Sequence, residues 1–286
     1  MHKNNIHNNN IHNNNYNFDA LINTYTLLKD FVFINKFNTK TIDFSNPKAV
    51  KVLNTALIKN HYNINYWKFS DENLCPPIPS RVDYIHHLND LIEPSKNIKV
   101  LDIGTGASLI YPLLGNAIYN WKFIATDIDI KSIENAQEII SKNKLEKNIN
   151  LRLQSNKKNI LNGIILADDY FNVSMCNPPF YKSEEEALKA TSRKLKNLNI
   201  TTKERNFSGN ANELLYNGGE KAFLHNYIFQ SKQYKEQCEW FTSLVSKKEL
   251  LKDLKRSLKK LNAKDIKVIN MEQGNKISRI LAWRFK

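Results

Sequence analysis

Hydrophobic segments alternate with polar, helix-like segments over most of the chain from residue 97 onward. Residues 98–103, Ile-Lys-Val-Leu-Asp-Ile, are typical of a buried strand that ends in a turn, Gly104-Thr105-Gly106. Further strands are expected at residues 121–127, 149–153, 171–176 and 240–245, and helices at residues 131–142, 221–230 and 248–261. Strands that alternate with helices predict an α/β fold with a doubly wound, mostly parallel sheet.

The end of the chain breaks this alternation. The last two strands are expected at residues 266–271 and 279–285, and only about seven residues join them. A parallel crossover needs a dozen or more residues, so these strands are predicted to pair antiparallel. We therefore predict one domain over residues 97–286 whose sheet ends in an antiparallel C-terminal strand.

Residues 18–96 have a different pattern. Apolar side chains recur at helical spacing over residues 18–32, and Pro47 marks the first position of a second helix. A short helix is expected at residues 84–91, after an extended connector at residues 75–79, where each proline disfavours the α conformation of the residue before it. These observations predict a helical N-terminal region.

Residues 1–17 are low in sequence complexity, since nine of the 17 are asparagine. Such a tract has too little apolar surface to offset the entropy of ordering it, so a disordered tail is predicted. Its histidines lack neighbouring carboxylates, and no metal site is expected there or elsewhere in the chain.

The composition narrows the class of protein further. No run of about 18 apolar residues exists among the 286, which argues against a membrane span. Three scattered cysteines and no apolar leader predict a cytoplasmic protein without disulfides. The net charge of +14 favours a polyanionic partner such as nucleic acid, although a lysine-rich solvated surface is an equally good interpretation of charge alone.

The glycine turn is the first candidate binding element. A Gly-x-Gly turn after a strand lets backbone N–H groups approach a ligand, and Asp127 lies at the end of the next strand, where a carboxylate can bind ribose hydroxyls. A dinucleotide fingerprint would need a third glycine at position 109, which is leucine. The turn therefore fits an adenosyl ligand without a pyrophosphate, or else it is only a tight turn followed by a surface aspartate.

The second candidate element is Asn177-Pro178-Pro179-Phe180, at the end of the strand predicted at residues 171–176. An exocyclic amine or an amide nitrogen is a poor nucleophile, because its lone pair is conjugated. The Asn177 side-chain oxygen and the Pro178 carbonyl can accept its N–H groups and stabilise the charge that develops as the nitrogen is methylated. Phe180 offers a stacking face for a planar substrate. A proline-rich loop without a role is the alternative interpretation.

Together these motifs resemble class I S-adenosylmethionine-dependent N6-adenine methyltransferases, which have a Rossmann-like fold. The resemblance extends over residues 18–286 to the ribosomal RNA large-subunit methyltransferase F family, whose members methylate N6 of one adenine in 23S rRNA. A eukaryotic relative modifies U6 small nuclear RNA. The segments that carry the closer match are residues 43–47, 74–79, 81–88, 110–113, 240–246, 273–274 and 282–283.

The resemblance implies a role for each matching residue. The implied cofactor-binding residues are Arg81, Asp102, Gly104, Thr105, Gly106, Ser108 and Asp127, with Arg81 at the methionine carboxylate and Asp127 at the ribose. The implied catalytic residues are Asn177 to Phe180. Relatives often have glutamate where this chain has Asp127, and an arginine- and histidine-rich arm where it has the asparagine tract. The implied partner is 23S rRNA or a large-subunit assembly intermediate, bound by a monomer.

Two charged segments are further candidates for RNA contact. Residues 182–217 form a long segment directly after the acceptor motif, and its cations include Arg193, Lys194 and Lys196. We expect this segment to order over the RNA, with Tyr181 extending the stacking face. The basic helix within residues 247–264 either contacts RNA or is a solvated face.

Three alternatives to these assignments are weighed. Cys176 is expected to pack in the core, because no activating base is apparent beside it. A protein-glutamine methyltransferase could use the same acceptor chemistry, and an inactive methyltransferase fold could bind RNA without reacting. The positive charge argues against the first of these two functions, and the intact motifs argue against the second.

Overall fold

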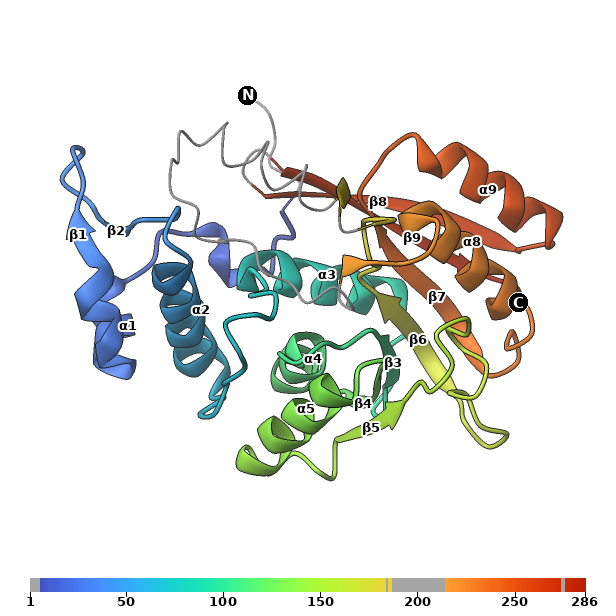
Figure 1. The fold of residues 1–286 in the computed structure, drawn as a ribbon, viewed down its shortest axis with the longest axis horizontal. Helices are drawn as coiled ribbons and strands as arrows, with labels where there is room; N and C mark the ends of the chain where they lie inside the picture. Colours follow the sequence, from blue (N-terminus) through green and yellow to red (C-terminus); the bar gives the residue numbers. More distant parts are fainter. Residues whose placement is uncertain (1–5, 184, 187–213, 274–275) are drawn as a thin grey trace.

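A seven-stranded sheet organises the chain in the computed structural model, which describes residues 6–183, 185–186, 214–273 and 276–286 (Figure 1). The strands follow the order β5-β4-β3-β6-β7-β9-β8. Their bounds are β3 Lys99–Ile103, β4 Lys122–Asp127, β5 Ile149–Leu153, β6 Phe171–Cys176, β7 Cys238–Val245, β8 Asp265–Gln273 and β9 Lys276–Arg284. The strands from β5 to β7 are parallel, while β9 pairs antiparallel with both β7 and β8, so the predicted doubly wound sheet is confirmed.

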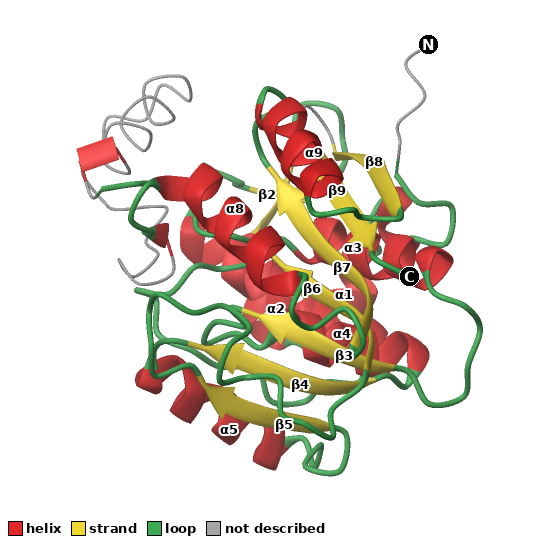
Figure 2. Ribbon diagram, turned by 90° about the vertical axis from the view of Figure 1, so that its right-hand side faces the viewer, coloured by secondary structure: helices red, strands yellow, loops and turns green. Residues whose placement is uncertain are grey.

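Helices cover both faces of this sheet, as Figure 2 shows. One face carries α4 (Ile110–Tyr119) and α5 (Ile130–Lys142), and the other carries α8 (Gly219–Ser231) and α9 (Leu250–Lys260). Alternate residues of β7 divide between the two cores, because successive side chains of a strand point to opposite faces. Trp240 packs with the α4 side, whereas Phe241 packs with the α8 side.

The N-terminal region is more varied than the sequence predicts. Its elements are α1 (Phe18–Thr24), the 3-10 helix η2 (Thr26–Phe31), the hairpin strands β1 (Val32–Ile34) and β2 (Lys40–Ile42), α2 (Pro47–Tyr62) and α3 (Ile78–Leu91). The expected helix at residues 18–32 therefore ends early, and the hairpin is not predicted. Helix α3 begins inside the expected connector, because Pro79 needs no N–H partner in a first turn.

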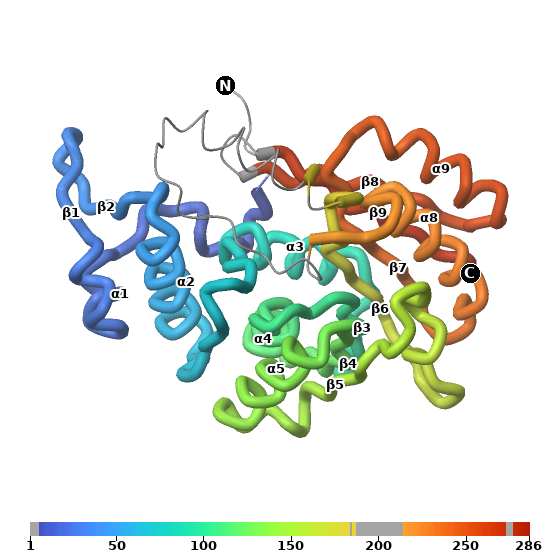
Figure 3. The backbone as a smooth tube through the Cα atoms, in the orientation of Figure 1, coloured from blue at the N-terminus to red at the C-terminus, as the bar shows by residue number. Residues whose placement is uncertain are grey.

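Residues 6–17 pack on α2 and α3 and include a short 3-10 helix, η1 (Ile11–Asn13), so the predicted disorder does not describe them (Figure 3). The Asn10 side chain is 2% exposed and donates from Nδ2 to the Pro79 carbonyl at 3.0 Å and to Asp83 Oδ1 at 3.2 Å. The His7 N–H donates to the same Asp83 oxygen at 2.7 Å, and His12 Nε2 lies 2.8 Å from the Tyr62 hydroxyl. Hydrogen bonds to partners distant in sequence thus order a tract that lacks an apolar face.

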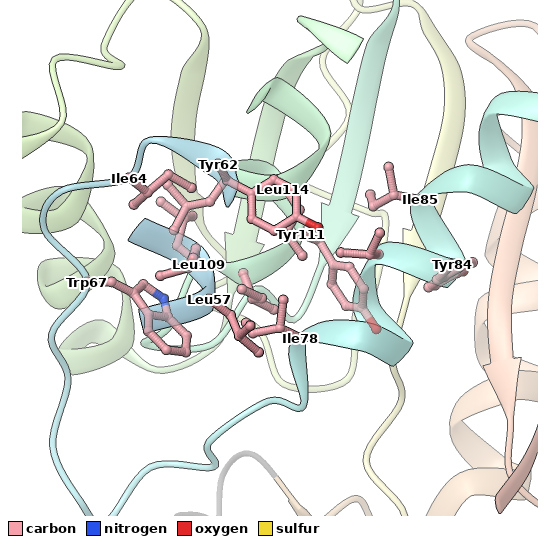
Figure 4. Close-up of a cluster of buried hydrophobic side chains, with 14 of the residues drawn as sticks. Leu57, Tyr62, Ile64, Trp67, Ile78, Tyr84, Ile85, Leu109, Tyr111 and Leu114 are labelled. Carbon is pink, nitrogen blue, oxygen red and sulfur yellow. The ribbon is translucent and has the colours of Figure 1, made fainter. Parts of the chain in front are cut away.

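The N-terminal region and the sheet share one hydrophobic core. In the cluster of Figure 4, Leu57 of α2 and Ile78 of α3 lie with Leu109 and Leu114 at α4. The Trp67 indole, in the segment between α2 and α3, donates to the Ser108 carbonyl, so the N-terminal region also contacts the residues just after the glycine turn.

No helix in the described part of the chain is long and apolar enough to cross a membrane.

Candidate active site

Three parallel strands end side by side at the edge of the sheet where ligands bind in doubly wound folds. Strand β3 leads into the turn at Gly104, β4 ends at Asp127, and β6 is followed by Asn177. Because β3 lies between β4 and β6, the two sequence-predicted elements flank one cavity, which Gly104, Asp127 and Asn177 all line.

The glycine turn contributes space rather than free N–H donors. Gly104 and Gly106 have φ values of +74° and +64°, a conformation that glycine adopts without steric cost. The N–H groups of Gly104 and Thr105 both donate to the Thr126 carbonyl at 2.9 Å, which differs from the expectation that they face a ligand. A Cβ on Gly104 would meet no described atom within 4 Å, so a side chain there would project into open space.

Asp127 is held in place by the backbone around it. One carboxylate oxygen accepts the N–H of Gly106 at 2.8 Å, and the other accepts the N–H of Asp129 at 3.0 Å. The side chain is buried, and burial raises the pKa of this carboxyl above its usual value. Each oxygen keeps lone pairs that can accept hydroxyl groups from a ligand in the cavity.

Several buried polar groups in or next to the lining of this cavity are incompletely hydrogen-bonded. Among the described residues, no hydrogen bond of normal length and angle satisfies the carboxylate oxygens of Asp102, the Thr105 and Tyr111 hydroxyls or Nε of Arg81, although Thr105 lies close to Asp102 and Arg81 close to Tyr111. Burial raises the pKa of Asp102 to about 7; the Thr105 hydroxyl and the Arg81 guanidinium oppose this shift, and the Asp127 carboxylate adds to it. Such groups are costly to bury unless a ligand completes their interactions.

These groups fit S-adenosyl-L-methionine. A guanidinium can pair with the carboxylate of its amino-acid end, and a carboxylate at the end of β4 can accept ribose hydroxyls, so the chemistry of the lining residues is compatible with this ligand. Arg81, Thr105, Gly106 and Ser108 line the cavity, whereas Asp102 is fully buried in β3 and is not among the lining residues. In the described part of the chain, no group of three or more His, Cys, Asp and Glu residues could hold a metal ion.

The acceptor motif separates this cavity from a second one. Phe180 and Tyr181 line the second cavity, and Asn177 and Arg81 line both. The Tyr181 N–H donates to the Leu214 carbonyl at 3.0 Å, and the Tyr216 N–H donates back to the Tyr181 carbonyl at 3.0 Å. The residues just after the acceptor motif and the residues just before α8 are therefore hydrogen-bonded to each other at the site. A ligand bound in the first cavity and a ligand bound in the second cavity can therefore contact each other beside Asn177.

Several groups at the site were given no role by the sequence analysis, although Leu74 and Tyr84 lie in segments that carry the family resemblance. Leu74 from the N-terminal region lines both cavities, while Lys157 and Tyr216 line the first one. The Tyr84 hydroxyl of α3 lies 2.7 Å from Thr242 Oγ1 and accepts the N–H of Cys176 at 3.5 Å, just before the acceptor motif. Tertiary contact brings these residues to the site, and their residue types alone do not indicate a role there.

Two further sequence predictions concern Cys176 and the charged segment after the acceptor motif. Cys176 is buried in the core as expected, and burial raises the pKa of its thiol well above the usual value. Arg193, Lys194 and Lys196 lie outside the described residues, as does most of the segment 182–217.

The family model and the curated relatives match this chain over its whole length. A family model described as RNA methyltransferase matches residues 1–286. The ribosomal RNA large subunit methyltransferase F of Colwellia psychrerythraea is 51% identical, and the match covers 100% of this chain and 99% of that protein. The protein of the same name from Flavobacterium johnsoniae is 49% identical, with coverage of 99% and 94%.

Two solved structures have the same fold over nearly the whole chain. The hMettl16 catalytic domain in complex with the MAT2A 3'UTR hairpin 1 has a TM-score of 0.86 at 30% identity, over 98% of this chain and 96% of that one. The N-terminal domain of human METTL16 in complex with SAH has a TM-score of 0.80 at 27% identity, over 98% and 99%. The likeness includes the N-terminal region as well as the sheet.

Proposed function

This chain belongs to the RNA methyltransferase family, and from that premise we propose that it transfers a methyl group to N6 of one specific adenine in 23S ribosomal RNA. It is an S-adenosyl-L-methionine-dependent enzyme with the class I Rossmann-like fold. The name shared by the bacterial relatives supports rRNA as the substrate. The observation that carries the proposal is the position of Asn177 between the two cavities.

We assign the first cavity to the cofactor. The Arg81 guanidinium binds the methionine carboxylate, and the buried Asp102 carboxyl favours the nearby ammonium group. Asp127 accepts the ribose hydroxyls, since its orientation is fixed by two backbone N–H groups. The turn at residues 104–108 accommodates the methionine chain, because Gly104 has no Cβ to fill the space. When bound, S-adenosyl-L-methionine supplies a methyl group on a positively charged sulfur.

The second cavity is assigned to the adenine. The Asn177 side-chain oxygen and the Pro178 carbonyl accept the two N–H bonds of the N6 amine and orient its lone pair toward the first cavity. These acceptors favour the positive charge that develops on nitrogen in the transition state. Phe180 and Tyr181 provide aromatic faces for an unpaired base. No general base is needed before transfer, because the amine proton becomes acidic only afterwards.

The substrate assignment has further consequences. An rRNA substrate places the protein in the cytoplasm, where it acts as a monomer on free 23S rRNA or on a large-subunit assembly intermediate. An adenine that is paired in the mature ribosome would be accessible only before assembly is complete. A methylation map of rRNA from cells that lack the gene would identify the nucleotide.

A methyl-transfer assay tests the proposed function. Purified protein and tritiated S-adenosyl-L-methionine are incubated separately with naked 23S rRNA, an assembly particle, tRNA and a release factor. Label at N6 of a single adenine in 23S rRNA is expected. Label in the release factor would support glutamine methylation instead, and no label in any substrate would indicate an inactive fold.

The Asn177→Ala variant tests the acceptor assignment. The variant should lose about 10²-fold or more in rate, the scale measured when one preorganised hydrogen-bonding group is removed from an active site. Cofactor affinity should change little. Asn97→Ala is the matched control, since Asn97 is exposed and lies before β3. Retention of more than about a third of the activity in Asn177→Ala would remove Asn177 from the reaction.

A further inference from the structure

Positive charge is concentrated in one short segment outside the two cavities. Residues 247–264 contain eight lysines and arginines and two carboxylates, so they carry +6 of the chain's net charge of +14. All eight cationic residues are exposed: Lys247, Lys248, Lys252, Lys255, Arg256, Lys259, Lys260 and Lys264. We call these residues the α9 basic segment.

Helix α9 presents these cations on its solvent side. Leu254 and Leu258 are fully buried against the α8 side of the sheet and fix the rotation of the helix. Lys252, Arg256 and Lys260 then follow one another at intervals of four residues, which places them in a row with a rise of about 6 Å per step. The result is a linear array of cations rather than a scattered set.

The stability of the helix does not account for this array. Like charges four residues apart repel one another along a helix surface. Lys247 and Lys248 precede the N-terminus of α9, where the helix dipole disfavours positive charge, and only the lysines of the last turn are placed favourably. The segment is therefore more positive than its own folding requires.

Carboxylates of the protein neutralise little of this charge. Asp253 Oδ2 accepts Lys221 Nζ at 2.9 Å, and its other oxygen lies 3.8 Å from Arg256. In the described part of the chain, no carboxylate lies within 4 Å of the ammonium groups of Lys252, Lys255 or Lys260. Most of the charge is thus available to an external polyanion.

The segment also begins beside the second cavity. Ser246, the residue after β7, lines that cavity together with Phe180 and Tyr181, and α9 starts four residues later at Leu250. A strand whose base enters the second cavity therefore has phosphates that can continue along this side of the molecule. Figure 1 places α9 far from α5, which lies at the opposite end of the sheet.

We propose that the α9 basic segment binds phosphates of the RNA that flank the target nucleotide. This proposal rests on the proposed function and adds a second contact surface to it. Phosphate binding by lysine and arginine releases counterions, so the contact contributes affinity and salt dependence without sequence specificity. The segment positions the RNA, while the second cavity selects the base.

A triple variant, Lys252→Gln, Arg256→Gln and Lys260→Gln, tests the proposal. The control variant carries Lys131→Gln, Lys142→Gln and Lys147→Gln, which removes the same charge from exposed positions in or just after α5. The RNA is the one that the wild-type protein methylates, and its affinity is measured between 50 and 300 mM salt. Melting curves and S-adenosylhomocysteine binding establish that both variants keep the wild-type fold.

The expected result is specific to the α9 variant. Its RNA affinity should fall about tenfold or more at low salt, and its log–log salt slope should decrease by about 2–3. Methyl transfer at saturating RNA should stay at the wild-type rate, because no reacting group has changed. Equal affinities and slopes in the two variants would overturn the α9 contact. Failure of the wild-type protein to methylate rRNA would instead overturn the proposed function.

Discussion

Replacement of Asn10 by alanine tests whether the asparagine-rich tract is part of the folded structure. Asn10 makes three side-chain hydrogen bonds, to the Pro79 carbonyl at 3.0 Å, to Asp83 Oδ1 at 3.2 Å and from the His12 N–H at 3.0 Å. Neutral hydrogen bonds contribute about 0.5–1.5 kcal/mol each and those to charged groups about 1.5–3 kcal/mol. The freed groups regain water when the tract separates from α3, so we expect a net loss of about 2 kcal/mol in docking free energy.

That loss corresponds to roughly a 30-fold larger population with residues 6–16 undocked. Hydrogen exchange measured by mass spectrometry reports this population, because the His7 amide donates to Asp83 of α3 and is protected only when the tract is docked. Asn15→Ala is the control, since Asn15 is exposed in the same tract. The main melting transition should not move, because docking can be lost without unfolding the sheet. Wild-type exchange rates in Asn10→Ala would refute the docked arrangement.

Three further predictions concern titration and the cofactor site. Burial, with His61 and His86, lowers the pKa of His12 from 6.5 to about 4, so the undocked tract binds the extra proton and undocking is favoured as pH falls. The protection factors of residues 6–16, which are exchange rates normalised to the intrinsic rate at each pH, should therefore decrease from pH 6.5 to 4, and much less in His12→Gln. The raised pKa of Asp102 means that ionisation of this group destabilises the folded protein increasingly from pH 3.8 to about 7. Asp102→Asn should therefore raise the free energy of unfolding at pH 8 by up to about 4 kcal/mol, while the variant binds S-adenosylhomocysteine more weakly. Calorimetry that finds neither change would contradict both effects. Asp127→Ala should weaken S-adenosylhomocysteine binding by about 1–3 kcal/mol, and an unchanged dissociation constant would exclude Asp127 from the site.

The sheet could be predicted from the sequence because its signals are local. Five apolar runs define the parallel strands, and helical segments are predicted between the second and third of them and between the fourth and fifth. The short connection before residue 279 requires the antiparallel pair. The N-terminal region lacks comparable signals. Residues 6–17 are ordered by contacts with Asp83 and Pro79, about 70 residues away, and composition carries no information about such partners.

The same distinction applies to the candidate site. The cavity lined by Gly104, Asp127 and Asn177 follows from one rule, since parallel strands direct their carboxyl ends to the same edge. The sequence could not reveal that the Tyr84 hydroxyl of α3 accepts the N–H before the acceptor motif, or that Leu74 lines both cavities. These roles depend on how the N-terminal region packs, and packing is a property of the whole fold.

The pairing of Tyr181 with Leu215 has a consequence for how this enzyme can diversify. Because the chain departs and returns at one point, residues between these two can be gained, lost or exchanged while Asn177 and Tyr216 keep their positions. The entropy of closing such a loop changes by only about 0.6 kcal/mol for each doubling of its length. The hydrogen bonds at Tyr181 and Tyr216 keep the acceptor motif and the residues before α8 together, whatever the number of residues between them.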